Sequence, residues 1–187
     1  MLTFVSSVLD IPTPVSTNSY ESIATTTLSS SAATITFSSI PSTYTHLQVR
    51  GIARDTSAGT TEIDIIMRYN GDSATNYAFH YLYGNGSVAG GAGQGTRSDP
   101  RAGLAVNNGA LANTFGVVVA DILDYRNTNK YKTTQVLAGT DRNGAGTVVA
   151  ESTLWMNTAA ITQIDLTVSG GSSFTANSQF ALYGIKG

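Results

Sequence analysis

Apolar and polar residues alternate with a period of two along most of this chain, and this alternation limits the possible folds more than any other feature. Ile35 and Phe37 alternate with threonines, and Leu47 and Val49 alternate with polar residues. Successive side chains of a strand point to opposite faces, so the alternation predicts strands with one face in a core. No helix-length window carries the apolar spacing of an amphipathic helix between credible caps. We therefore expect an all-β fold.

The alternating segments are short and are separated by turn signals, including Asn70-Gly71 and Asn143-Gly144. About nine strands at this spacing are typical of sandwiches and barrels. The pattern predicts an antiparallel β-sandwich that is jelly-roll-like, with an open sandwich of another connectivity as the alternative. Besides the segments above, strands are expected at 23–28, 63–69, 77–83, 115–123, 131–138, 148–156, 161–168 and 180–185.

The chain length of 187 residues suits one domain with a substantial core, and the absence of cysteine means that no disulfide supports it. Residues 1–19 contain Pro12 and Pro14 and keep neither period for long, so they are predicted to form an extended N-terminal arm. Residues 20–187 are then a single β-sandwich domain. The apolar residues of the arm need a surface to cover and are predicted to bind a partner: Leu2, Phe4, Val5, Leu9, Ile11 and Val15.

A glycine-rich segment at 84–110 interrupts the alternation. It is too long for a hairpin loop, and long loops in compact domains usually function in binding or are disordered. We expect an exposed loop here, with a short helical turn within 104–112 as an option.

Charged residues make up only 12% of the chain, and the net charge is −2. Binding to nucleic acid or to an anionic membrane needs clustered Lys and Arg, and the sequence has no such cluster. No apolar run approaches ~18 residues, and the first basic residue is Arg50, so neither a membrane span nor a secretory signal is visible. The lack of cysteine fits assembly in a reducing cytoplasm.

Residues for catalysis or metal binding are sparse. Only His46 and His80 could act as a histidine base, both lie in strand patterns, and no GxSxG elbow is present. The glycine-rich segment lacks the following helix of a nucleotide-binding loop. Without cysteine or a local histidine pair, no metal ligand set is apparent. We therefore expect no catalytic residues, no metal and no cofactor, and a protein that is not an enzyme.

Tyr77, Phe79, Tyr81 and Tyr83 share one face of a predicted strand. Aromatic residues at strand spacing usually fill a core, and this is the favoured interpretation. The alternative is a platform for stacking carbohydrate. The residues predicted to contact a glycan or another subunit are Tyr77, Tyr81, Tyr83, Arg97 and Arg101.

Several stretches resemble small virion structural proteins of tailed bacteriophages, notably those that infect cyanobacteria. They span most of the domain: YESIATTTL (20–28), ITFSSIPSTYTHLQVRGIARD (35–55), RYNGDSATNYAFHYLYGNGS (68–87), NTAAITQIDL (157–166) and ALYGIKG (181–187). The resemblance implies a component of a phage particle, placed either on the capsid or in a tail appendage.

The compact domain, the absence of fibrous repeats and the apolar arm favour the capsid over the tail. The resulting hypothesis is a capsid decoration (cement) subunit on the exterior of the virion, assembled in the host cytoplasm. Its expected partners are the major capsid protein and itself, as a homotrimer, with no nucleic acid and no membrane. The alternative is a receptor- or glycan-binding module of a tail fibre or tail tip.

Overall fold

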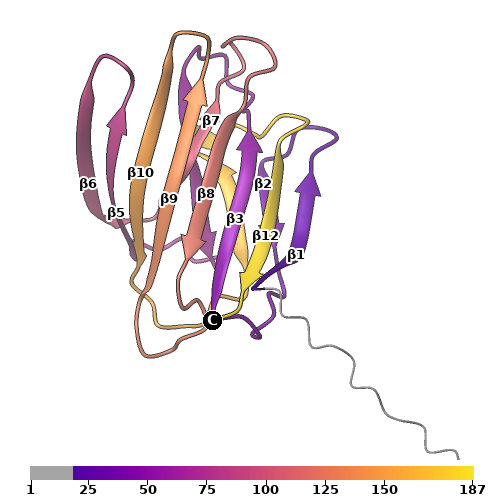
Figure 1. Ribbon diagram of the computed structural model, residues 1–187, viewed down its shortest axis with the longest axis vertical. Helices are drawn as coiled ribbons and strands as arrows, with labels where there is room; N and C mark the ends of the chain where they lie inside the picture. Colours follow the sequence, from indigo (N-terminus) through magenta and orange to yellow (C-terminus); the bar gives the residue numbers. More distant parts are fainter. Residues whose placement is uncertain (1–18) are drawn as a thin grey trace, which may run out of the picture.

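The computed structural model describes residues 19–187 and is all β, apart from one short 3-10 turn at Ser169–Gly171. Two antiparallel sheets pack face to face, the larger in front and the smaller behind in Figure 1, which confirms the predicted β-sandwich. The strands are β1 (Tyr20–Thr27), β2 (Thr34–Phe37), β3 (His46–Ala53), β4 (Glu62–Tyr69), β5 (Tyr77–Gly84), β6 (Ala89–Arg97), β7 (Arg101–Val106), β8 (Gly116–Ile122), β9 (Lys132–Asp141), β10 (Gly146–Trp155), β11 (Ile164–Val168) and β12 (Gln179–Ile185).

The large sheet has eight strands in the order β1-β12-β3-β8-β9-β10-β5-β6, and the small sheet has four in the order β2-β11-β4-β7. Consecutive strands β8, β9 and β10 form a meander, whereas most other connections cross between the sheets. Such crossings bring strands from both halves of the chain into one core. The large sheet is twice as wide, and β7 at the edge of the small sheet packs against β8, β9 and β10. The inner face of β5 and β6 therefore lies beyond the edge of the small sheet.

The core between the sheets is filled by the alternate residues that the sequence pattern assigned to it. Leu47 and Val49 of β3 and Ile122 of β8 are almost fully buried. At one end of the sandwich, the rings of Tyr69, Tyr77 and Trp155 pack together, with centroids 5.5 to 6.4 Å apart. This aromatic cluster stabilises the sandwich through its large buried area.

Asp72, in the turn after β4, ties this aromatic cluster to the chain. Its carboxylate accepts hydrogen bonds from Trp155 Nε1 (2.8 Å), from Asn76 Nδ2 (3.0 Å) and from the backbone amide of Ala74 (2.9 Å). Burial pushes the pKa of Asp72 upward, but the hydrogen bonds from Asn76, Trp155 and Ala74 outweigh it, and the net pKa is lowered. The ionised form of Asp72 is therefore part of the folded structure.

Two of the four Asn-Gly pairs, Asn70-Gly71 and Asn143-Gly144, form turns in which both residues have positive φ. The angles are 53° and 69° at Asn70-Gly71 and 65° and 91° at Asn143-Gly144, as in type I′ turns. The second pair closes the β9–β10 hairpin, where the Arg142 amide donates to the Ala145 carbonyl at 2.7 Å. The predicted turns are confirmed.

The expectation of a long loop at 84–110, with a helical turn in 104–112, is wrong. The segment forms two strands, β6 at the edge of the large sheet and β7 in the small sheet. Three glycines of β6 face side chains of β5: a Cβ at Gly90, Gly91 or Gly93 would lie within 3 Å of the Tyr83, Leu82 or His80 side chain, respectively. Side chains of β5 thus occupy the space where β6 has no Cβ atoms. In sheets, a large side chain on one strand often covers a glycine on the next strand in this way.

Strand β7 packs closely against β8 and β9 at Gly103. Its φ is 110°, and a Cβ there would lie 2.9 Å from the Val118 side chain of β8 and 3.2 Å from Ala138 of β9. Both the backbone conformation and the space therefore require glycine. Residues 102–106 are all buried, so this strand carries no alternation of exposure.

The predicted partner-binding residues of the arm, Leu2 to Val15, lie outside the described residues, which begin within the predicted arm at residue 19.

Candidate functional site

The structure divides the tyrosine stripe of β5 into a buried half and an accessible half. Tyr77 is fully buried in the aromatic cluster with Tyr69 and Trp155, so its position fits the core interpretation and its ring is not accessible at the surface. Phe79 is also buried, but Tyr81 and Tyr83 are only half-buried. The change along the strand follows from the edge of the small sheet, which covers the inner face of β5 only in part.

Two adjoining hollows of about 250 and 290 Å³ lie between the inner face of β5 and β6 and the edge formed by β4 and β7. They share Asp64, Tyr81 and Arg101, and together we call them the tyrosine cleft. Four of the five residues predicted to contact a glycan or a subunit line it, and only Tyr77 does not. The other lining residues include Glu62, Phe79, Tyr83, Asn85, Gln94, Arg97, Asp99 and Thr147.

Arg101, at the start of β7, is the centre of the cleft. Its Nη2 lies 3.1 Å from Asp64 Oδ1 of β4 and 3.1 Å from Glu151 Oε1 of β10. Its guanidinium carbon lies 4.2 Å from the centroid of the Tyr81 ring, a cation–π contact. These contacts on three sides hold the guanidinium in one position.

Burial raises the pKa of both carboxyl groups beside Arg101, and the positive charge of Arg101 opposes that rise. The two groups differ in access, because the Asp64 side chain is 34% exposed and the Glu151 side chain is 0% exposed. Glu151 Oε2 has no hydrogen-bond partner among the described residues. For Glu151, burial therefore raises the pKa of the carboxyl group, and the charge of Arg101 lowers it.

Since one Arg101 nitrogen contacts both groups, the two carboxylate oxygens lie within about 6 Å of each other, a separation found in glycoside hydrolases. The arrangement nevertheless places Arg101 between them and shields Glu151 from any ligand in the cleft. A general acid or nucleophile must touch its substrate. The two carboxylates therefore orient Arg101, and of these two carboxylates only Asp64 can contact a bound molecule.

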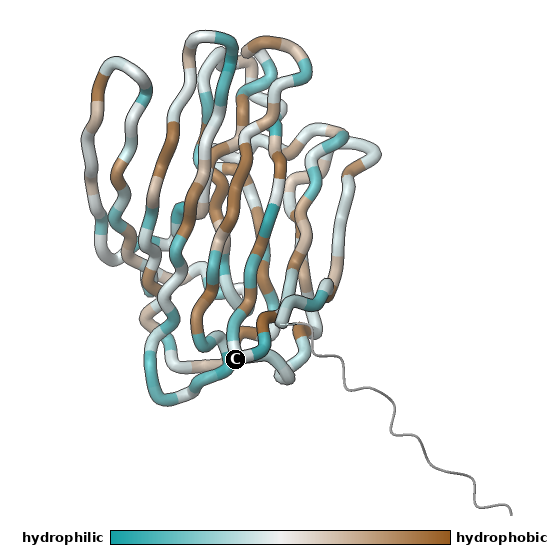
Figure 2. Tube along the Cα trace, viewed as in Figure 1, coloured by the Kyte–Doolittle hydropathy of each residue, from teal (hydrophilic) through white to brown (hydrophobic). Residues whose placement is uncertain are grey.

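The opposite, outer face of the large sheet carries a second feature, which we call the apolar face. It consists of five exposed aliphatic residues from five strands: Ile52, Leu82, Val117, Leu137 and Val148. Leu82, Leu137 and Val148 are 69%, 60% and 60% exposed. In Figure 2, brown apolar segments run along the middle strands of this sheet.

The strand register makes the apolar face continuous. Leu137 pairs with Ala150 on one side and Val119 on the other, and Ala150 pairs with Leu82, so these residues form one row across four strands. Ile52 pairs with Val117 in the adjoining row. Contiguous exposed apolar patches are a feature of protein interaction surfaces.

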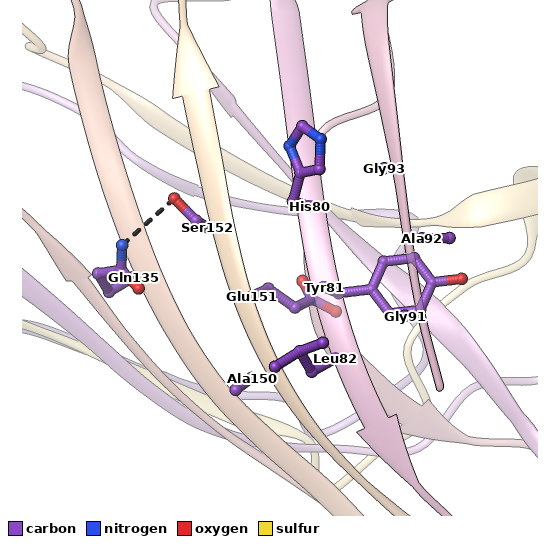
Figure 3. Close-up of a pocket in the computed structure, with 10 residues that line it drawn as sticks. All are labelled: His80, Tyr81, Leu82, Gly91, Ala92, Gly93, Gln135, Ala150, Glu151 and Ser152. Atoms are coloured by element: carbon purple, nitrogen blue, oxygen red, sulfur yellow. Dashed lines mark hydrogen bonds between the residues drawn. The ribbon is translucent and has the colours of Figure 1, made fainter. Parts of the chain in front are cut away.

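A shallow hollow of about 570 Å³ lies at the β6 end of the apolar face (Figure 3). It forms because Gly91 and Gly93 have no side chains and Ala150 and Ser152 have small ones, while His80 and Leu82 project from β5 between them. Gln135 donates to Ser152 at 3.2 Å along its far side. The glycines of β6 thus shape both faces of this end of the sheet.

Sequence reasoning found the tyrosine cleft in part and missed the apolar face. Leu137 and Val148 belong to predicted strands, but nothing in the alternation shows that the outward side of several strands is apolar in the same rows. That information depends on strand order and register.

Within residues 19–187, no cluster of three or more His, Cys, Asp or Glu side chains is arranged to hold a metal ion. His46 and His80 lie on different strands of the large sheet, and His46 Nδ1 accepts the Asp124 amide at 2.9 Å. The described part of the chain contains no helix of sufficient length and apolarity to span a membrane. No protein-family model matches the sequence, and no curated protein matches it at a significant level.

Proposed function

We propose that this chain is a virion structural protein, a capsid decoration subunit that binds the assembled capsid lattice and stabilises it. The observation that carries the proposal is the apolar face, since a soluble subunit exposes such a surface at a cost unless a partner covers it. The outer surface of the eight-stranded sheet offers a broad area for contact with a lattice of repeated subunits. The resemblance of the sequence to phage virion proteins supports the same assignment.

The mechanism is binding by mass action. A subunit that binds only the assembled lattice stabilises it by RT ln(1 + [L]/Kd), about 2.7 kcal/mol per site at a hundredfold excess over Kd. The apolar face contributes through burial of Leu82, Leu137 and Val148, at ~25 cal/mol per Å² before the costs of association. The low charge of the chain makes this attachment tolerant of salt.

In this proposal the partners are the major capsid protein and two further copies of the chain, on the outside of the particle. Residues 1–18 would add a second attachment to a neighbouring subunit. Two independent contacts raise overall affinity through effective concentration.

The test uses purified particles stripped of the protein and reloaded with variants. The double variant Leu137→Asp, Val148→Asp should reduce occupancy at least about tenfold, because two charges would be buried against the partner. Val88→Asp, Leu123→Asp is the matched control, since both are exposed aliphatic residues outside the apolar face, and it should bind normally.

Deletion of residues 1–18 should lower occupancy less than the double variant does. Occupancy is measured by quantitative gel analysis and by electron microscopy of the reloaded particles. Normal loading of the double variant would refute attachment through the apolar face, and failure of the unmodified protein to bind particles would refute the decoration function itself.

A further inference from the structure

The tyrosine cleft has an aromatic wall whose position is fixed. A Cβ at Gly90 would lie 2.9 Å from Tyr83 Cε1 and 3.0 Å from its Oη, so the Tyr83 ring lies directly over the backbone of β6. Tyr81 lies beside it, with ring centroids 6.2 Å apart, and Arg101 covers the Tyr81 ring. Tyr83 is therefore the ring that can receive a ligand, and it is already held in place before a ligand arrives.

Two residues that line both hollows, Asp64 and Arg101, also carry hydrogen-bonding atoms that no other described residue uses. Arg101 uses Nε and Nη2 for Glu151 and Asp64, while its Nη1 donates to no other described residue. Asp64 Oδ1 faces Arg101, its Oδ2 accepts no hydrogen bond from the described part of the chain, and its side chain is one-third exposed. A donor and an acceptor thus lie side by side, fixed by the fully buried Glu151 beneath them.

The charges of the cleft nearly balance. Three carboxylates, those of Glu62, Asp64 and Asp99, and two guanidinium groups, those of Arg97 and Arg101, line the cleft. Behind the lining, Arg142 pairs with Glu62 and the buried Glu151 pairs with Arg101. Most of the lining charges are thus already paired, since Arg97 also forms two hydrogen bonds to Asp99. The slight negative excess disfavours an anionic ligand, because a like charge in a partly desolvated site is repelled.

Size and polarity together restrict the ligand further. The two hollows of about 250 and 290 Å³ adjoin, which places the cleft at the lower end of the range of small-molecule sites. An aromatic ring suits a ligand with one apolar face, and a neighbouring donor and acceptor suit vicinal hydroxyl groups, each of which can both donate and accept. A pyranose ring has this combination of a C–H face and vicinal hydroxyls.

We infer that the tyrosine cleft binds a neutral pyranose sugar, with its C–H face on Tyr83 and two neighbouring hydroxyls on Arg101 and Asp64. This site is separate from the apolar face, which lies on the other side of the large sheet. It gives a particle that carries many copies of the chain a multivalent surface for glycans.

The experiment titrates the full chain with neutral methyl glycosides of glucose, galactose and mannose and with N-acetylglucosamine, followed by ¹H–¹⁵N NMR. At least one sugar should give saturable shifts confined to residues around the cleft, with a dissociation constant in the millimolar range expected of a single sugar ring. Glucuronate is the anionic comparison and should bind more weakly. Absence of saturable shifts with every neutral sugar, or tighter binding of glucuronate, would overturn the inference.

Variants assign the binding to the proposed groups. Tyr83→Ala should weaken binding about tenfold, while Tyr83→Phe, which keeps the ring, should bind like the parent. Asp64→Asn keeps an acceptor and should weaken binding less than Asp64→Ala. Tyr131→Ala is the matched control, because Tyr131 is an exposed tyrosine outside the cleft. Equal binding by Tyr83→Ala and the parent would contradict the stacking role even if a sugar binds.

A trisaccharide of the best-bound sugar distinguishes the source of the ligand. Tighter binding than the monosaccharide indicates that the cleft takes part of a polysaccharide chain, and equal binding indicates a single terminal sugar. Particle occupancy by Tyr83→Ala should be normal, so failure of sugar binding and failure of the decoration function give different results.

Discussion

Arg54, which directly follows β3, is predicted to hold the loop between β7 and β8 in place. It is 6% exposed, and its guanidinium donates six hydrogen bonds to that loop. Four go to the backbone carbonyls of Asn108, Ala110, Leu111 and Thr114, at 2.8 to 3.0 Å. No other described side chain makes as many hydrogen bonds to one loop.

Replacing Arg54 with methionine keeps much of the aliphatic stem and removes all five N–H donors, and with them the six hydrogen bonds. Water can reach the acceptors of the exposed residues Asn108 and Leu111 after a small movement, whereas Ala110 and Thr114 are half-buried. Counting one unsatisfied acceptor at each of these two, at about 1.5 kcal/mol each, the expected loss of unfolding free energy is about 3 kcal/mol. For a domain of this size the loss corresponds to a fall in Tm of about 6 to 12 °C.

Urea denaturation followed by the fluorescence of Trp155, the only tryptophan, measures this loss. Trp155 is buried in the core and is distant from the loop in the sequence, so its fluorescence reports unfolding of the core. Hydrogen exchange at residues 107–114 should also become faster, since loops without their hydrogen bonds open locally. Arg126→Met is the control: Arg126 is exposed and donates only to the Ser42 carbonyl, so its loss should cost under about 1 kcal/mol. Equal effects of the two substitutions, with unchanged exchange in the loop, would refute the role of Arg54.

Two further predictions concern the core. Gly51→Ala should destabilise the fold by about 1 to 3 kcal/mol, because the new Cβ would lie 2.3 Å from the ring of the fully buried Phe180. Gly95→Ala is the control, because a Cβ at Gly95 would have no atom within 4 Å. Equal stability of the two variants in urea would contradict the close packing at Gly51. Asp72 has a lowered pKa in the folded state, so it contributes stability above its unfolded pKa of about 3.9, and this contribution is lost as the pH falls through the folded value. The difference in unfolding free energy between the parent and Asp72→Asn should therefore shrink from pH 7 to pH 3, and a constant difference would show that the charge of Asp72 is not what stabilises the Trp155 contact.

Much of the fold could be predicted from local pattern alone. The strand at β8 was expected at 115–123 and spans Gly116–Ile122, and the strand at β12 was expected at 180–185 and spans Gln179–Ile185. Both are rich in β-branched, aromatic and other apolar residues, which favour strands with a buried face. The turns at Asn70-Gly71 and Asn143-Gly144 could be predicted for a similar local reason, since few other residues adopt positive φ at low cost.

The glycine-rich segment shows where local pattern fails. Alternation is a property of side chains, and Ala89–Arg97 has almost none, so nothing in it could indicate a strand. It is a strand because β5 supplies a hydrogen-bonded edge and because Tyr83, Leu82 and His80 cover its glycines. Those partners are close in sequence, but their role depends on the hairpin having formed.

The candidate sites could be predicted from the sequence only in part. The sequence suggested Tyr81, Tyr83, Arg97 and Arg101 as contact residues, but it could not separate them from Tyr77, which shares their face of the strand. The edge of the small sheet makes that separation, by covering Tyr77 and leaving Tyr83 accessible. The link from Arg101 to Glu151 spans 50 residues and exists only because β7 packs over β10.

The sequence by itself determined the fold class, the positions of most strands and the turns between them, because each depends on neighbouring residues and on the preference of the backbone. Only the tertiary structure decided which strands are adjacent, in which register, and how far one sheet extends beyond the other. Those choices create the apolar face from Leu82, Leu137 and Val148, and the tyrosine cleft from strands of both sheets. The physical reason is that both surfaces are made of long-range neighbours, whose contact depends on the packing of the whole sandwich and not on any local segment.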